Sequence, residues 1–141
     1  MKIHPWFPLV FLFCGLLLNA CSATQPEEQS QLFGSSWKVI NLNDAVVTSD
    51  SVATLNFSAD GRLSGEAFCN NYMAQYQLVE EKLKIFKIAS TKMACEPSLM
   101  RLQSQFLGIL YTITDYSIRP DGNLQILGTG NKKLIAQPVT P

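Results

Sequence analysis

The chain has 141 residues, of which 47% are hydrophobic, and its 11 basic residues balance its 11 acidic residues at neutral pH. This length is enough for one ordinary domain with a core that can fold alone. A chain without net positive charge lacks the clustered basic surface that nucleic-acid binding requires, so we expect no nucleic-acid partner.

The first element is an apolar segment that ends in a lipobox, the processing motif of bacterial lipoproteins. Lys2 precedes the apolar residues 9–18, and Leu18-Asn19-Ala20-Cys21 places an aliphatic residue, a small residue and a cysteine where the processing enzyme needs them. The apolar run is too short for a comfortable bilayer span of about 20 residues. We therefore expect residues 1–20 to be a removed signal peptide and Cys21 to be lipidated. A buried core helix or an uncleaved membrane anchor is the alternative.

Residues 21–31 follow as a polar segment rich in Ser, Gln, Glu and Pro, which predicts a flexible tether. Each buried CH₂ group of the acyl chains on Cys21 would add about 0.8 kcal/mol to membrane binding, so release should be negligible. Ser22, rather than an aspartate, follows the cysteine, as in lipoproteins sorted to the outer membrane. We expect a lipid-anchored protein of the bacterial cell envelope, at the outer membrane and facing the periplasm.

Cysteine and histidine usage limits the chemistry of residues 32–141, the expected folded domain. After lipidation of Cys21, the domain keeps Cys69 and Cys95, and two thiols in an oxidising periplasm are normally joined as a disulfide. The single histidine, His4, lies in the signal segment. Its loss excludes Cys–His and Ser–His–Asp catalysis and a Cys₂His₂ zinc site, so we expect neither a metal nor a cofactor.

The folded domain is predicted to be mainly β, with about eight short strands. Alternating apolar residues form the strands, and turns such as Asp60-Gly61 and Asp121-Gly122 separate them. The expected strands are residues 36–42, 52–57, 62–68, 72–79, 82–88, 112–118, 124–127 and 133–137. Short antiparallel strands in this number predict a small curled sheet or a partial barrel.

One amphipathic helix is expected between the fifth and sixth strands. Pro97 suits the first turn of a helix. The apolar residues after it recur at steps of three and four, as on one helical face: Leu99, Leu102, Phe106, Ile109 and Leu110. This apolar stripe should pack against the sheet.

Several segments, taken in order, form a distinctive set. They are Trp37, residues 55–65 (LNFSADGRLSG), Cys69-Asn70-Asn71-Tyr72, Thr91-Lys92-Met93-Ala94-Cys95, and Phe106-Leu107 with Leu110. The set covers residues 33–137 and resembles the META domain family, whose HslJ-like members are bacterial envelope lipoproteins. The motif positions that the resemblance singles out are Asn70, Tyr72, Thr91 and Met93.

Two positions depart from the family pattern. Phe68 stands where a glycine usually precedes the cysteine, which argues against a role that needs close backbone approach there. Gln103 stands where a helix glutamate is expected, which argues against a required carboxylate in the helix.

The resemblance implies envelope association, a link to stress and to tolerance of hydrophobic antibiotics, and no agreed enzymatic activity. The residues agree, because Asp60 and Asp121 lie in turns and Glu66 is the only carboxylate beside the motif hairpin. Asn70 is best explained as a side chain that caps a turn. We expect a non-catalytic binding or scaffolding protein whose partner is another envelope protein or an apolar small molecule. The alternative is an enzyme or inhibitor with a site between Gly65 and Asn71.

Overall fold

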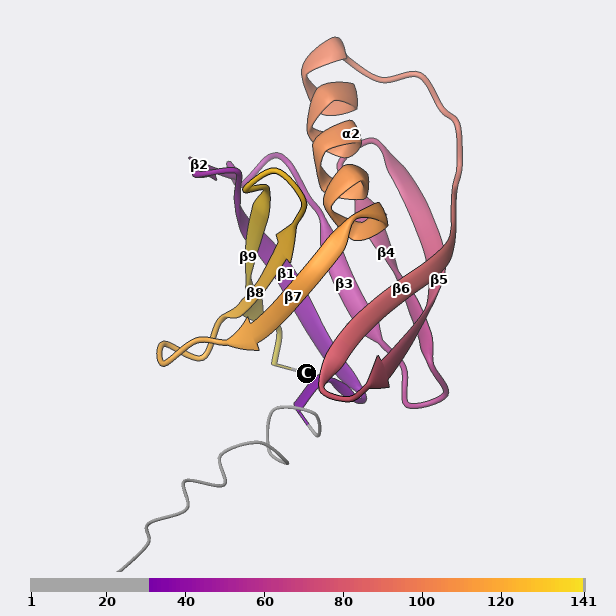
Figure 1. The fold of residues 1–141 in the computed structure, drawn as a ribbon. Helices are drawn as coiled ribbons and strands as arrows, with labels where there is room; N and C mark the ends of the chain where they lie inside the picture. Colours follow the sequence, from indigo (N-terminus) through magenta and orange to yellow (C-terminus); the bar gives the residue numbers. More distant parts are fainter. Residues whose placement is uncertain (1–30, 141) are drawn as a thin grey trace, which may run out of the picture.

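The structure, a computed structural model, describes residues 31–140. The expected signal peptide and Cys21 lie outside the described residues. The described part forms a nine-stranded antiparallel sheet that curls into a nearly closed barrel, with the helix α2 over one end (Figure 1). The expectation of a mainly β domain with a curled sheet or partial barrel and one amphipathic helix is confirmed.

The named elements have the following bounds: β1 Ser35–Leu42, β2 Ala45–Val46, β3 Thr54–Phe57, β4 Arg62–Ala67, β5 Asn70–Val79, β6 Lys82–Ser90, α2 Pro97–Tyr111, β7 Ile113–Ile118, β8 Leu124–Gly128 and β9 Lys133–Pro138. Along the sheet the strands follow the order β6-β5-β4-β3-β1-β9-β8-β7, and β2 pairs with β1 beside this path. The terminal strands β6 and β7 pack together, which brings the two edges of the sheet side by side (Figure 1).

The core fills the inside of the barrel, because alternate residues of each strand point inward. In β5, for example, Tyr72, Ala74 and Tyr76 are buried while the residues between them are exposed. The helix completes the core from above, with Phe106, Ile109 and Leu110 buried. The predicted apolar stripe therefore faces the sheet as expected.

Bulges explain where the apolar residues fall out of strict alternation. In β1, Trp37, Val39 and Leu42 are all buried, although the last two are three residues apart. The register between β1 and β9 shifts between Val39 and Asn41, so Ile40 is an extra residue in β1. The bulge returns Leu42 to the inner face.

Strand boundaries differ from the expected ones by a few residues. The strand expected from residue 52 begins at Thr54, and β5 begins at Asn70 rather than at Tyr72. The two-residue strand β2 was not expected, because Ala45 and Val46 are both exposed and carry no alternation. Within residues 31–140, no helix combines the length and the hydrophobicity that crossing a membrane requires.

The barrel has two ends that differ in what they carry. At the entry end, where the described chain begins, lie residues 31–36, the turns at residues 58–61 and 80–81, and residues 138–140 (Figure 1). At the helix end lie α2, the β4–β5 turn and residues 91–96 (Figure 1). The motif positions near the β4–β5 turn thus gather at the helix end, far from the place where the described chain starts.

Candidate functional site

Asn70 is the centre of the motif residues, and its buried side chain joins two elements of the helix end. Its Oδ1 accepts hydrogen bonds from the Thr91 hydroxyl at 2.8 Å and from the Met93 backbone N–H at 2.7 Å. Its Nδ2 donates to the Met93 carbonyl at 3.2 Å and to Gln103 Oε1 at 3.0 Å. Asn70 therefore fixes the segment before α2, and α2 itself, to the start of β5. We call these four residues the Asn70 junction.

The sequence predicted that the Asn70 side chain caps a turn. In the structure the side chain bonds residues that are distant in the chain. Its partners Thr91, Met93 and Gln103 lie 21, 23 and 33 residues further along the chain. Gln103 was noticed only as a departure from the family pattern, yet it supplies an acceptor to the junction. In the sequence, the only indication of this bond was that Gln103 lies within the expected helix.

A disulfide between Cys69 and Cys95 lies next to the Asn70 junction, with 5.9 Å between the two Cα atoms. It connects the β4–β5 turn to the residues immediately before α2. The expected pairing of the two cysteines is thus present in the structure. Together the disulfide and the Asn70 junction fasten the covering helix to the barrel.

Tyr72 points into the barrel, and burial raises the pKa of its phenol. The hydroxyl donates a hydrogen bond to the Thr54 carbonyl at 2.9 Å, and the ring packs edge-on against Phe106 at 5.5 Å. A phenol in this position stays protonated and bonded to the backbone. Tyr72 is thus part of the core, and its motif position is explained by packing.

Gly65 lies where β4 approaches β3 too closely for a side chain. A Cβ atom on Gly65 would collide with the carbonyl and hydroxyl oxygens of Thr54. The hydroxyl of Thr54 instead accepts a hydrogen bond from the Glu66 backbone N–H at 3.0 Å. The glycine at position 65 thus allows β4 to approach β3 closely. The sequence did not indicate that Thr54 is the residue that it contacts.

Phe68 has a left-handed backbone conformation, with a φ of 64°. An L-residue pays about 1–2 kcal/mol for this conformation, whereas glycine does not, which explains why glycine suits the position. The Phe68 ring packs edge-on against Phe106, with 6.1 Å between the ring centres. Compared with a glycine, Phe68 thus has a less favourable backbone conformation and gains an aromatic contact with the helix.

Of the other motif positions, Thr91 and Met93 contribute mainly through polar atoms. The Thr91 hydroxyl bonds Asn70 and also accepts a hydrogen bond from the Asn71 backbone N–H at 3.3 Å. Met93 contributes its backbone groups, and its side chain is 62% exposed. The Asn70 junction therefore uses the backbone N–H and carbonyl of Met93, and the Met93 side chain lies at the surface.

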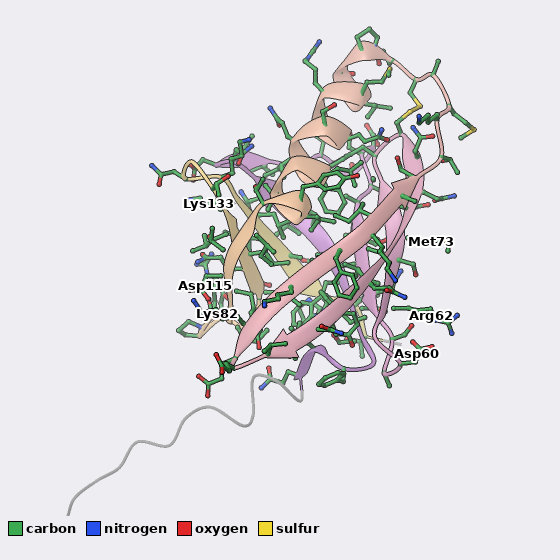
Figure 2. All side chains as sticks on the ribbon, turned by 45° about the vertical axis from the view of Figure 1, so that its right-hand side comes forward. Asp60, Arg62, Met73, Lys82, Asp115 and Lys133 are labelled. Atoms are coloured by element: carbon green, nitrogen blue, oxygen red, sulfur yellow. A yellow bond between two sulfur atoms is a disulfide. The ribbon has the colours of Figure 1, made fainter. Side chains whose placement is uncertain are left out.

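The turn aspartates are held locally, as the sequence suggested. Asp60 forms an ion pair with Arg62 at 2.6 Å (Figure 2), and the Arg62 hydrogen bond lowers the pKa of Asp60. Asp121 accepts a hydrogen bond from the Asn123 backbone N–H at 3.0 Å, and this bond lowers the pKa of Asp121. Both carboxylates are therefore ionised turn residues.

A small polar hollow of about 220 Å³ lies beside the motif hairpin. Two carboxylates, Asp50 and Glu66, line it together with Phe68, Cys69 and Asn71 among others. This hollow lies at the place that the alternative enzymatic interpretation indicated, and Asp50 is a residue that the sequence did not suggest. Among residues 31–140, no three His, Cys, Asp or Glu side chains are grouped to hold a metal ion.

Two larger hollows lie at the entry end. One, of about 620 Å³, is lined by Phe33, Tyr76, Val79 and Phe86 among others. The second, of about 520 Å³, is lined by residues that include Gly34, Trp37, Pro138 and Val139. Residues 33–37 thus have an open hollow on each side.

Comparison with known proteins gives one family. The sequence profile described as the META domain matches residues 30–140. A protein from Burkholderia xenovorans, solved by NMR, is similar with a TM-score of 0.65 and 26% identity over 78% of this chain and 85% of that chain. A second protein solved by NMR has a TM-score of 0.63 at 20% identity over 77% and 92% of the two chains, a likeness in fold alone. No curated protein matches the chain.

Proposed function

Because the chain belongs to the META domain family, we propose that it is a lipid-anchored bacterial envelope protein whose domain binds or scaffolds another envelope component. The observation that carries the non-catalytic part is the use of the motif side chains. The polar atoms of Asn70, Tyr72 and Thr91 all bond within the domain. These internal hydrogen bonds explain the motif positions through the structure of the domain, without a catalytic role.

The internal bonding extends to the whole described core. Within residues 31–140, every buried side-chain nitrogen and oxygen has a hydrogen-bond partner. Active sites commonly hold polar groups whose partner is the substrate, and such groups mark a site when they remain unpaired in the free protein. This supports a rigid domain that presents its outer surface to a partner, such as another envelope protein or an apolar small molecule.

The anchor part of the proposal rests on the lipobox. Metabolic labelling with a palmitate analogue should mark the wild-type protein and leave Cys21→Ser unlabelled. A matched substitution of the next residue, Ser22→Ala, keeps the cysteine and should still be labelled. Equal labelling of Cys21→Ser and wild type would refute lipidation at this residue.

The envelope role can be tested by complementation. Deletion of the gene should sensitise cells to hydrophobic antibiotics such as novobiocin, and the wild-type gene should restore tolerance. Cys21→Ser should fail to restore it, because the domain would no longer be held at the membrane. A rescue by Cys21→Ser equal to that of the wild type would show that anchoring is unnecessary for the function.

The second candidate is an enzyme or inhibitor with its site in the small polar hollow, since that hollow has the carboxylates Asp50 and Glu66 on its wall. General acid–base catalysis would need at least one of the two carboxylates. Glu66→Gln and Asp50→Asn should therefore rescue the deletion fully if the role is scaffolding. Loss of rescue in a variant that keeps its thermal stability would instead favour catalysis in this hollow.

A further inference from the structure

The entry end of the barrel presents apolar side chains to solvent. Phe33 is 47% exposed, Val79 42% and Val139 46%. Phe33 and Val79 line the larger hollow at this end, and Val139 lines the smaller one. Three large apolar side chains beside two open hollows form an exposed apolar surface, and surfaces of this kind mark sites of contact with a protein or a membrane.

We propose that this entry-end surface rests on the lipid bilayer that holds the anchor, with Phe33, Val79 and Val139 in contact with the membrane interface. The inference depends on the proposed function, because it needs the lipid at Cys21. It adds the orientation of the domain on the membrane and names lipid as the partner of the entry-end surface.

The length of the linking segment favours the entry end as the end that meets the membrane. Ten residues, from Cys21 to Ser30, separate the anchor from the described domain, and they span at most about 36 Å when fully extended. The ten residues of β5 extend over about 33 Å, and because barrel strands tilt by about 35–45° from the axis, the barrel is about 25 Å long. For the helix end to lie on the membrane, the linking residues would have to use most of their reach to run back along the barrel. The entry end, where the described chain begins, meets the membrane without this requirement.

The chemistry of the surface indicates which lipids it contacts. An aromatic ring with aliphatic neighbours suits the boundary between headgroups and acyl chains. Among the nearby basic side chains, Arg62 pairs with Asp60 at 2.6 Å and Arg119 with Asp121 at 3.4 Å, and the exposed Lys82 directly follows two acidic residues, Glu80 and Glu81. No excess of positive charge is then left there to attract anionic headgroups. We expect the contact to form on zwitterionic lipid and to be insensitive to salt.

The proposed orientation leaves the helix end free. Met93 and Met100, which are 62% and 43% exposed, would face the periplasm. The helix end therefore stays accessible to a protein partner, with the membrane on the opposite side.

Two tryptophan variants test the orientation. Phe33→Trp places a reporter at the entry end, and Val46→Trp places one at β2, away from that end, where the side chain is 76% exposed. The full chain is produced in a host that acylates lipoproteins and reconstituted into phosphatidylethanolamine–phosphatidylcholine vesicles, with or without brominated acyl chains. The buried Trp37, which is 4% exposed, gives the common background and is measured in the wild type.

On the vesicles, the tryptophan emission that Phe33→Trp adds to that of the wild type should shift to the blue. Brominated lipid should quench this added emission, at low and at high salt. The emission of Val46→Trp should show neither change. Hydrogen exchange on the unsubstituted protein provides a second measurement: residues 79–82 should exchange more slowly on vesicles than in the Cys21→Ser chain, and residues 91–95 should not change.

The outcomes separate the two proposals. Protein that fails to float with the vesicles overturns the anchor, and this inference with it. Protein that floats, but whose two reporters respond equally or not at all, overturns the orientation and leaves the anchor standing. Quenching of Val46→Trp alone would mean that another face of the domain meets the membrane.

Discussion

Asn70 Nδ2 and Gln103 Oε1 are 3.0 Å apart, although the two residues are separated by 33 positions in the chain. The bond connects the first residue of β5 to the second turn of α2. An amide oxygen accepts this hydrogen bond without carrying charge. Gln103 can therefore fill a position where the family resemblance suggested a glutamate, and the helix is held to the barrel by a neutral contact.

Removal of the Asn70 side chain should destabilise the domain. Asn70→Ala would leave the Met93 backbone N–H, the Thr91 hydroxyl and Gln103 Oε1 without their partner. These hydrogen bonds are part-buried, and each contributes about 0.5–1.5 kcal/mol, so we expect the loss of several to lower the free energy of unfolding by about 1–3 kcal/mol. Urea denaturation measures it. The neighbouring exposed residue supplies the control, and Asn71→Ala should cost less than about 0.5 kcal/mol. Equal losses would show that the junction is not a stabilising element.

Two glycines should respond in opposite directions to the same substitution. Gly65→Ala places a methyl group against Thr54, and overpacking of this kind costs about 1–3 kcal/mol. Gly108 lies inside α2, and a Cβ atom there would meet nothing within 4 Å. Gly108→Ala should therefore stabilise the domain by about 0.5–1 kcal/mol, through helix propensity. Melting temperatures of the two variants decide the matter, and a stable Gly65→Ala would contradict the close approach of the strands.

Phe68 offers a test of its left-handed backbone. Phe68→Ala and Phe68→Gly both lose the ring contact with Phe106, but only alanine keeps the unfavourable φ. The glycine variant should be more stable than the alanine variant by about 1 kcal/mol. At Gln75, an exposed residue of β5, the order should reverse, with glycine less stable than alanine. The same order at both positions would rule out backbone strain at Phe68.

The helix core can be tested with adjacent residues. Phe106 is fully buried and its ring meets those of Phe68 and Tyr72, so Phe106→Ala should cost about 3–5 kcal/mol. Gln105 is exposed, and Gln105→Ala should change the stability by less than about 0.5 kcal/mol. Chemical denaturation of both variants makes the comparison. Similar small losses would mean that another face of α2 packs on the barrel.

The periodic parts of this fold could be predicted from local sequence. The helix that begins at Pro97 and its buried Phe106 follow from spacing, and inward residues of β5 such as Tyr76 follow from alternation. Local spacing does not describe interruptions, because an extra residue such as Ile40 is recognised only against its partner strand. The short β2 was missed for the same reason, since its two residues are defined by pairing with β1.

The candidate site shows a similar division. The pairing of Cys69 with Cys95 could be inferred because no other thiols remain in the expected domain. The meeting of Asn70 with Gln103 depends on how α2 lies across the barrel end, which no short segment determines. Asp50 reaches the wall of the small hollow for the same reason. Contacts that depend on the packing of distant elements need the structure.

The position of β1 between β3 and β9 has a consequence for the timing of folding. The strand that is synthesised first pairs with the one that is synthesised last, Val39 opposite Ala136. Until residues 133–138 have emerged from the ribosome, one edge of β1 has no partner and the barrel cannot close. Pairing between such distant segments is slow to form. The barrel therefore cannot close while the chain is being made, a delay that would suit the export across a membrane that we propose.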